Sequence, residues 1–293
     1  MLASLYFSGL RVKKHEIFQI FLFILIPIMS LVILASFTVF TTEDIIFTHA
    51  AVDNKITSLG FAPNQVSAIM GLGAFVAFLC LFIVPSNLLM MRYVLIFCII
   101  WCFSQSALTF SRGGVYNALG AIVAASLYLI RDKKITFYLF FGFIITALLL
   151  NFVIFPKLDE FTSGNLGKRF GNIDPTGRDD IAKADLLIFQ EHPLFGVGLG
   201  QSPEYHILTF HKKAASHTEP TRMLAEHGSF GLLALLVLVL ILFSRLTRKT
   251  SPLEKAVIVS VTIWAFLYMG HAAMRLAAPA LLFGLGSITL DEE

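Results

Sequence analysis

Residues 17–40 read IFQIFLFILIPIMSLVILASFTVF, which is 24 consecutive residues without an Asp, Glu, Lys or Arg. A helix that spans a bilayer needs about 20 largely apolar residues, so this segment predicts a transmembrane helix. The segment is longer than the hydrophobic region of a signal peptide, and no small-x-small cleavage site follows it. We therefore expect a membrane protein whose first anchor is retained.

Seven further windows lack these charged residues. The chain is 57% hydrophobic and 14% charged, against about 45–50% and 25% in soluble domains, which excludes a single water-soluble core. The last two windows are short, so their helices are expected to include flanking residues, with Lys255 reaching back to the interface. The sequence predicts an all-α, polytopic integral membrane protein with about eight transmembrane helices. The seven windows are 66–84, 93–110, 114–130, 135–155, 228–244, 256–269 and 277–290.

The distribution of basic residues predicts how the helices are oriented. The short loops on one side hold only three of them, Lys55, Arg112 and Arg275, whereas those on the other side hold eleven. The positive-inside rule therefore places both termini in the cytoplasm and the long loop outside. The eleven are Arg11, Lys13, Lys14, Arg92, Arg131, Lys133, Lys134, Arg245, Arg248, Lys249 and Lys255.

The expected organisation has three parts: a membrane bundle of five helices over 1–155, an external loop over 156–227, and three membrane helices over 228–293. Met1–Leu10 looks like the tail of another apolar segment, so helices upstream of it are an open alternative.

The three cysteines lie inside apolar windows and are assigned to packing. The net charge of +3 has no clustered basic signature, so no nucleic-acid partner is expected.

The external loop is patterned, unlike a plain linker. A turn signal at residues 174–178 precedes apolar residues at helical spacing, which predicts an amphipathic helix from about Asp179 to Gln190. The glycine run Gly196–Gly200 has no preceding strand and no GK[ST] context. A tight turn packed on the helices is therefore favoured over a nucleotide site. The neighbouring acids Asp179 and Asp180 diverge on a helix and are assigned to solvation.

A second helix is expected to begin after Ser216 and to continue into the window 228–244. Ser216 and Glu219 have the spacing of a capping box, although Pro220 could instead make Thr218 the cap. Either arrangement places His217 at the first turn of a helix on the outer membrane face. No metal site is expected, because the loop has no cysteine and its histidines lack the spacing of a helical zinc pair. These histidines are His192, His206, His211, His217 and His227.

Four short motifs follow one another between about residue 61 and residue 231. They are Phe61-Ala62-Pro63-Asn64, Ser111-Arg112-Gly113-Gly114, Gly177-Arg178 with the later Pro193-Leu194-Phe195-Gly196-Val197-Gly198, and His217 followed by Gly228 and Gly231. The last looks like the H-N/S-x9-G-x-x-G signature of the O-antigen ligase and O-antigen polymerase superfamily of bacterial membrane glycosyltransferases. Together the four motifs resemble that superfamily in content and order. Thr218 departs from the usual Asn, Ser or Gln, and the chain is shorter than usual members.

The resemblance implies a metal-independent glycosyltransferase of the bacterial cytoplasmic (inner) membrane, in lipopolysaccharide or polysaccharide biosynthesis, that needs no cofactor. Its donor would be a glycan linked to undecaprenyl diphosphate, and the loop over 156–227 would be periplasmic. The acceptor would be the lipid A core or another lipid-linked repeat unit, with membrane lipids as further partners. Ligase, polymerase and protein glycosyltransferase stay open because all three need the same donor chemistry.

The resemblance also assigns roles to residues. Breaking a sugar–phosphate bond builds negative charge on the diphosphate, and arginines can stabilise it. Arg112 is well placed because Gly113 and Gly114 open a helix whose N-terminus, capped by Ser111, points outward. His217 is the candidate general base, since the pKa of histidine lies near the working pH. Arg178 and Arg222 are further candidates for the diphosphate, and the secondary candidates are Glu219, Arg169, His271 and Arg275.

Alternatives remain for several of these assignments. Arg178 could cap the loop helix by pairing with Asp174 or Asp179, and Arg222 could form a solvated ion-pair face with neighbouring acids. His271 and Arg275 could be interfacial anchors. A transporter would place ionisable residues or broken helices near the membrane midplane, and the eight windows contain no acid, Lys or Arg. A non-catalytic or truncated membrane scaffold is the other alternative.

Overall fold

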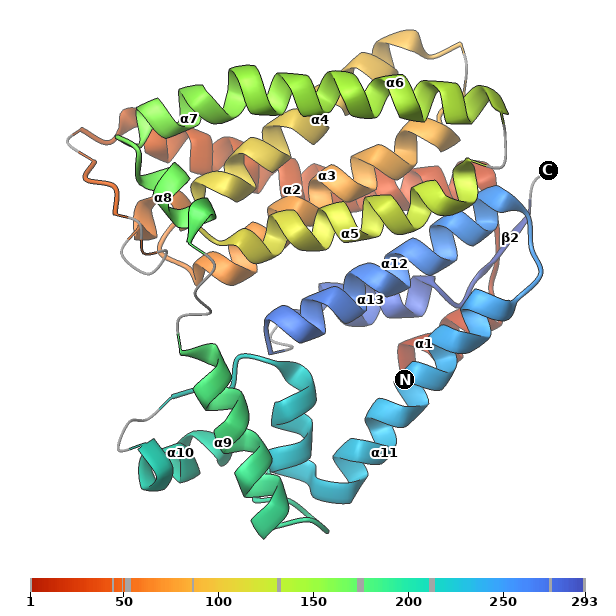
Figure 1. Ribbon diagram of the computed structural model, residues 1–293. Coiled ribbons are helices and arrows are strands. Elements are labelled where there is room, and N and C mark those ends of the chain that lie inside the picture. Colours follow the sequence, from red (N-terminus) through yellow and green to blue (C-terminus); the bar gives the residue numbers. More distant parts are fainter. Residues whose placement is uncertain are drawn as a thin grey trace.

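A computed structural model of the chain describes residues 2–43, 45–48, 50, 54–85, 87–130, 133–172, 177–210, 214–273 and 276–291. The prediction of a helical membrane protein is confirmed, because helices make up nearly all of its regular structure (Figure 1). The helices are α1 (Leu2–Ser8), α2 (Lys14–Thr41), α3 (Pro63–Ile83), α4 (Leu89–Leu108), α5 (Arg112–Leu129), α6 (Lys133–Leu149), α7 (Phe155–Phe161), α8 (Asn165–Gly171), α9 (Arg178–Glu191), α10 (Ser202–Phe210), α11 (Glu219–Thr247), α12 (Pro252–His271) and α13 (Ala278–Leu285). A 3-10 turn (Lys55–Ser58) and a π-helical turn (Leu150–Ile154) complete the helical elements.

The apolar windows coincide with helices. Six helical segments in the described residues are long and apolar enough to cross a membrane: α2, α3, α4, the run Phe141–Phe161, α11 and α12. The window 277–290 is different, because its helix α13 has only 8 residues and is therefore about 12 Å long. It does not provide a full-length spanning helix.

Small residues let the central helices approach closely. α5 packs against α3 on one side and α12 on the other. A Cβ atom placed on Gly71 of α3 would lie 2.3 Å from the carbonyl oxygen of Gly114 in α5. Such contacts stabilise helix pairs within a membrane, where apolar surface is not driven together by water. The three cysteines are buried and free, as expected for packing residues.

The amphipathic helix predicted from about Asp179 to Gln190 is confirmed as α9, Arg178–Glu191. α9 and α10 lie together with the first turns of α11, beside the ends of the bundle helices (Figure 1). From this group α11 bends sharply and runs toward the opposite end of the molecule. The bundle therefore has one end that carries the short helices α8, α9 and α10.

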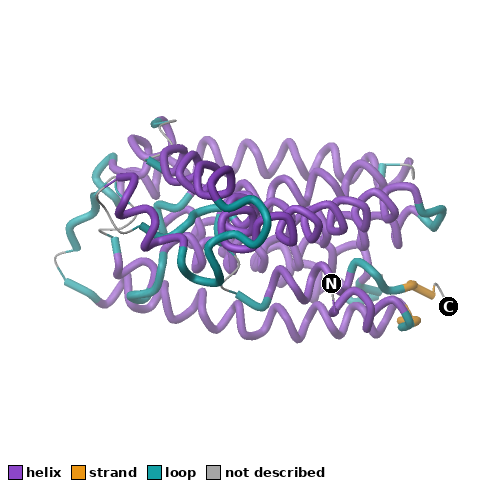
Figure 2. The backbone as a smooth tube through the Cα atoms, turned by 90° about the horizontal axis from the view of Figure 1, so that it is seen from below, coloured by secondary structure: helices purple, strands orange, loops and turns teal. Residues whose placement is uncertain are grey.

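The other end carries both ends of the chain, in a small sheet that the sequence analysis did not anticipate. Strand β1 (Arg11–Lys13) pairs in parallel with strand β2 (Thr289–Asp291), with Arg11 opposite Thr289. Figure 2 shows the two strands, in orange, near the C-terminus, and Figure 1 shows β2 on the side of the molecule away from α9 and α10. The segments 11–13 and 289–291 thus lie on the same side of the molecule.

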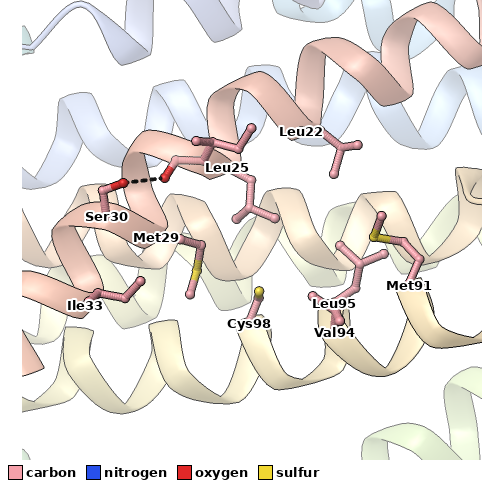
Figure 3. Close-up of a pocket in the computed structure, with 10 residues that line it drawn as sticks. Leu22, Leu25, Met29, Ser30, Ile33, Met91, Val94, Leu95 and Cys98 are labelled. Carbon is pink, nitrogen blue, oxygen red and sulfur yellow. Dashed lines mark hydrogen bonds between the residues drawn. The ribbon is translucent and has the colours of Figure 1, made fainter.

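A pocket of about 360 Å³ lies between α2 and α4 (Figure 3). Apolar side chains such as Leu25, Met29 and Leu95 line it, together with the hydroxyl group of Ser30, which donates to the carbonyl oxygen of Ile26. The pocket contains no charged group and lies along the half of α4 that is remote from α5. It offers nothing that could bind a phosphate or activate a hydroxyl group.

Candidate active site

Three helix ends meet through the side chain of Arg178, the first residue of α9. One of its terminal nitrogens lies 3.4 Å from Nδ1 of His271 at the end of α12, and the other donates to Oδ1 of Asn64 at 3.2 Å. The same Asn64 oxygen accepts a hydrogen bond of 2.8 Å from the hydroxyl group of Ser111, directly before α5. These three contacts connect the ends of α3, α5, α9 and α12.

Two further arginines lie beside this contact. Arg169 of α8 is buried, and its Nε donates to the carbonyl oxygen of Phe110 at 2.9 Å. Arg112, the first residue of α5, donates to the carbonyl oxygen of Asn172, directly after α8. We call Arg112, Arg169 and Arg178 the arginine cluster. The structure brings together three of the predicted arginines, which are separated by up to 66 positions in the chain.

The positive charges of the arginine cluster repel one another. Burial lowers the pKa of the Arg178 guanidinium, and the positive charges of Arg169 and Arg112 lower that pKa further. Burial and the charge of Arg112 likewise lower the pKa of Arg169. Among the described residues, no carboxylate lies within ion-pair distance of Arg169 or Arg178. An anion bound here would offset the repulsion.

The start of α5 differs from the predicted cap. Ser111 occupies the N-cap position but makes no capping hydrogen bond with its side chain, because its hydroxyl group donates to Asn64 instead. The first N–H groups of α5 therefore lack a capping side chain, and such groups bind anions readily. Gly113 and Gly114 have packing roles here. A Cβ atom on Gly113 would lie 1.7 Å from Nε2 of His271, and one on Gly114 would lie 2.1 Å from the carbonyl oxygen of Ser67.

The contacts of His271 define its protonation. A guanidinium group only donates, so Nδ1 accepts from Arg178 and the ring proton lies on Nε2. Nε2 is buried against Gly113 and has no hydrogen-bond partner among the described residues. His217 lies near enough to His271 for the two rings to interact electrostatically, which brings the predicted base to the edge of the arginine cluster. Arg275, the remaining secondary candidate, lies outside the described residues.

The helix after His217 begins as the second of the two predicted arrangements. α11 starts at Glu219 with Thr218 in the N-cap position and Pro220 in the first turn. The capping box of Ser216 with Glu219 does not form. The hydroxyl group of Ser216 donates to Asp185 at 2.9 Å, and Glu219 pairs with Arg222.

Arg222 is held by carboxylates and makes none of the contacts of the arginine cluster. Its guanidinium forms ion pairs of 2.6 Å with Glu219 and 2.9 Å with Glu226. The ion-pair alternative from the sequence is therefore confirmed, but the two carboxylates are buried where a solvated face was expected. The charge of Arg222 is already neutralised in this arrangement.

Part of the chain is similar to a known protein family. Residues 97–236 match a family model described as O-antigen ligase. This match, over slightly less than half of the chain, supports a relationship to the O-antigen ligase superfamily. No curated protein matches it at a significant level. The matched range contains all three residues of the arginine cluster and His217, whereas Asn64 and His271 lie outside it. Together with the apolar helices, the match supports a multi-pass membrane glycosyltransferase of the ligase or polymerase type.

Two of the sequence motifs meet at a break in α11. Gly228 has φ 57° and ψ −132°, which interrupts the helix. The segment after Pro193 fills the gap: the amide groups of Val197 and Gly198 donate to the carbonyl oxygens of Ala225 and Glu226, both at 3.0 Å. The tight turn predicted for the glycine run is thus packed on a helix. Its second function, which the sequence did not reveal, is to replace the missing helical hydrogen bonds.

Sequence reasoning missed three residues of the site. Asn64 was assigned only to a motif at the start of a helix, and Asp185 and His206 received no role. Asp185 is fully buried and accepts hydrogen bonds from His206 at 2.9 Å, Ser216 at 2.9 Å and Thr221 at 2.7 Å. This network fixes α9 and α10 to the segment that carries His217. The sequence did contain a signal for Asp185, because an acid on the apolar face of an amphipathic helix needs buried polar partners.

Proposed function

We propose that this chain transfers a glycan from undecaprenyl diphosphate to an acceptor hydroxyl group at the outer face of the cytoplasmic membrane. The observation that carries the proposal is the arginine cluster. Its like charges are gathered beside an uncapped helix N-terminus, and burial and mutual repulsion lower the pKa of Arg169 and Arg178. A diphosphate is the anion that fits, because guanidinium groups bind phosphate oxygens in two-pronged geometry.

In the proposed reaction, His217 accepts the proton of the acceptor hydroxyl group. The acceptor oxygen then attacks the anomeric carbon, and the bond between that carbon and the diphosphate oxygen breaks. The electron pair of this bond leaves with the lipid diphosphate, whose added negative charge is stabilised by Arg112, Arg178 and Arg169. The products are the glycosylated acceptor, undecaprenyl diphosphate and a proton, which returns to solvent from His217.

The contacts around the cluster assign supporting roles. Asn64 and His271 position Arg178, because they contact its two terminal nitrogens. Gly113 and Gly114 let α12 and α3 reach the start of α5. Arg222 and Glu219 maintain the first turn of α11 after His217, a role that replaces direct binding of the diphosphate by Arg222. Arg275 stays a secondary candidate from the sequence.

The topology belongs to the proposal. Cytoplasmic termini, a periplasmic loop over 156–227 and membrane parts over 1–155 and 228–293 follow from the charge distribution. The reaction is proposed to need no metal, because arginines supply the positive charge. Ligase activity toward the lipid A core and polymerase activity toward a lipid-linked repeat unit share all these steps.

The test uses the purified chain with a labelled undecaprenyl-diphosphate oligosaccharide in EDTA, and resolves the products on a gel. A growing ladder of sugars indicates a polymerase, and a single shifted band that requires lipid A core indicates a ligase. His217→Ala and Arg112→Ala should each lower the rate by at least about a hundredfold. Lys168→Ala, which removes an exposed positive charge next to Arg169, is the matched control and should retain activity.

Three results would contradict the proposal. Turnover that EDTA abolishes would show that a metal takes part. Unchanged rates in both variants would remove the roles of His217 and Arg112. If the chain transfers glycan to none of the acceptors offered, a non-catalytic scaffold becomes the better explanation.

A further inference from the structure

A second polar site lies next to the arginine cluster. It is a cavity of about 220 Å³ between the start of α10, the segment before α11, and the first turns of α11. Ser202, Ser216, Arg222 and Glu226 supply its polar groups, and Ala215 and Ala273 supply apolar wall. Its volume lies below the roughly 300–1,000 Å³ of pockets for drug-sized ligands, so it has room for one small ring.

The charge of this cavity is opposite to that of the arginine cluster. Arg222 is paired with two carboxylates, Glu219 and Glu226, so the three groups together carry one net negative charge. A phosphate would be repelled here and attracted to the cluster. The two neighbouring sites therefore favour different ligands, an anion at one and an uncharged group at the other.

The cavity can hydrogen-bond to hydroxyl groups in both directions. Arg222 has five N–H donors, and its hydrogen bonds to Glu219 and Glu226 use three of them. The carboxylate of Glu226, which is 2% exposed, accepts from Arg222 at 2.9 Å and from Ser202 at 3.0 Å. A sugar hydroxyl group both donates and accepts, and it therefore matches a wall that presents guanidinium, carboxylate and hydroxyl groups together.

The cavity lies where an acceptor would have to be. Ser216 in its wall is directly followed by His217, the proposed base. Ala273, which also lines the cavity, comes two residues after His271, which contacts Arg178. The chain segments that form the cavity thus also carry the two histidines at the edge of the arginine cluster.

We propose that this cavity binds an uncharged sugar ring of the acceptor and presents one of its hydroxyl groups to His217. The proposal rests on the proposed function and adds the acceptor subsite to it: one neutral, hydroxyl-rich ring. Glu226, Arg222 and Ser202 hold the ring, while the negative charge of the Glu219–Arg222–Glu226 group excludes phosphorylated sugars.

Binding is measured apart from catalysis, by saturation-transfer NMR on the full chain in lipid nanodiscs. The probes are the methyl glycosides of glucose, galactose and mannose, with glucose 6-phosphate as the charged competitor. At least one neutral glycoside should receive saturation, and glucose 6-phosphate should not displace it. Ala215→Trp, at an exposed position of the wall, should fill the cavity and abolish the signal without disturbing the core.

Two substitutions test the chemistry of the wall. Ser202→Ala should weaken neutral glycoside binding by a few-fold to about tenfold, the effect of one hydrogen bond. Glu226→Gln should admit glucose 6-phosphate as a competitor, because the net negative charge is removed. Ser126→Ala, whose hydroxyl group contacts only its own helix, is the control and should change neither result.

The outcomes separate the two proposals. If the chain transfers no glycan but a neutral glycoside binds and Ala215→Trp abolishes its signal, the cavity is a sugar site although the proposed function fails. If the chain is active, Ser202→Ala should raise KM for the acceptor and leave KM for the donor unchanged. The proposal is overturned if no neutral glycoside binds, if Ala215→Trp leaves the signal intact, or if glucose 6-phosphate competes equally in the unmodified chain.

Discussion

At the scale of single residues, the site depends on one amide oxygen. Oδ1 of Asn64 accepts from Ser111 and from Arg178, so it connects the start of α5 to the start of α9. Asn64→Ala removes this acceptor and leaves Arg178 free to turn toward solvent. We expect kcat to fall about tenfold or more, because a lost hydrogen bond to a charged group costs about 1.5–3 kcal/mol.

The measurement is single-turnover transfer from the lipid-linked donor, with Gln65→Ala at the neighbouring position as the matched control. Asn64→Asp keeps the acceptor oxygens and should restore the position of Arg178. Its added charge should nevertheless weaken donor binding. If Asn64→Ala leaves the rate unchanged, Asn64 does not position Arg178.

The repulsion inside the arginine cluster predicts that a bound anion stabilises the fold. Pyrophosphate at ten times its dissociation constant should raise stability by about 1.4 kcal/mol, measured as an increase in Tm. Arg178→Ala should reduce the increase, whereas Lys168→Ala should retain it. An equal increase in all three proteins would mean that pyrophosphate binds elsewhere.

The same cluster should not make stability depend on ordinary pH. The folded-state pKa of Arg178 lies below its usual value, so the charged form opposes folding at every pH below the folded-state value. This destabilisation would fade only as the pH rises through the lowered pKa toward the usual value. Between about pH 6 and 9 the arginine stays charged, so the pyrophosphate effect should stay constant where pyrophosphate keeps the same charge.

At the scale of elements, the break in α11 depends on Gly228. Its positive φ is costly for other residues, and an added Cβ atom would lie 2.6 Å from the amide nitrogen of Gly196. Gly228→Ala should destabilise the fold by more than the roughly 1–3 kcal/mol of the backbone conformation alone. Gly142→Ala, in a helix with open space at that position, should cause no loss. Thermal unfolding in detergent distinguishes them, and equal Tm values would contradict the role of Gly228.

Asp185 and His206 form the buried link between α9 and α10. Nδ1 of His206 lies 2.6 Å from the carbonyl oxygen of Ala214, and Nε2 lies 2.9 Å from Asp185. Asp185→Leu should destabilise the fold by at least about 1–3 kcal/mol, because it leaves buried polar groups, His206 among them, without their partner. Adding His206→Leu should recover part of the loss. Additive losses in the double-mutant cycle would show that the two residues are not coupled.

The helices could be predicted because long apolar windows are a local signal. The site could be predicted only in part, because its contacts join distant positions. Arg112, Arg178 and His217 belong to recognisable motifs, but Asn64 contacts residues 47 and 114 positions away. Ser111 was predicted to cap α5 from its neighbours alone, and the competing contact with Asn64 overrode that preference. Apolar composition predicts that a segment is buried, but it does not determine how long its helix is. The helix α13 is shorter than the apolar window that predicted it.

At the scale of the whole molecule, the two ends of the bundle have different functions. One end is closed by pairing of the chain ends, β1 with β2, and by Arg245. The buried guanidinium of Arg245 donates to Thr262 of α12 at 2.6 Å and to the carbonyl oxygen of Phe283 in α13 at 2.8 Å. A charge inside a membrane bundle is tolerated when the protein satisfies it in this way. The contacts at this end hold the helices together. At the other end, the arginine cluster has no carboxylate within ion-pair distance of Arg169 or Arg178 among the described residues, so its charge can attract an anion.

That separation predicts how salt affects each substrate. The donor diphosphate is attracted by the arginine cluster, and the Debye length falls from about 10 Å at 0.1 M salt to about 3 Å at 1 M. KM for the donor should therefore rise several-fold over this range. KM for an uncharged acceptor should change little, because the cavity beside Arg222 recognises hydroxyl groups. Initial rates with each substrate varied in turn measure both values. Removing one charge by Arg178→Gln should lower the salt dependence of the donor, and equal dependence for both substrates would contradict the division into an anionic and a neutral subsite.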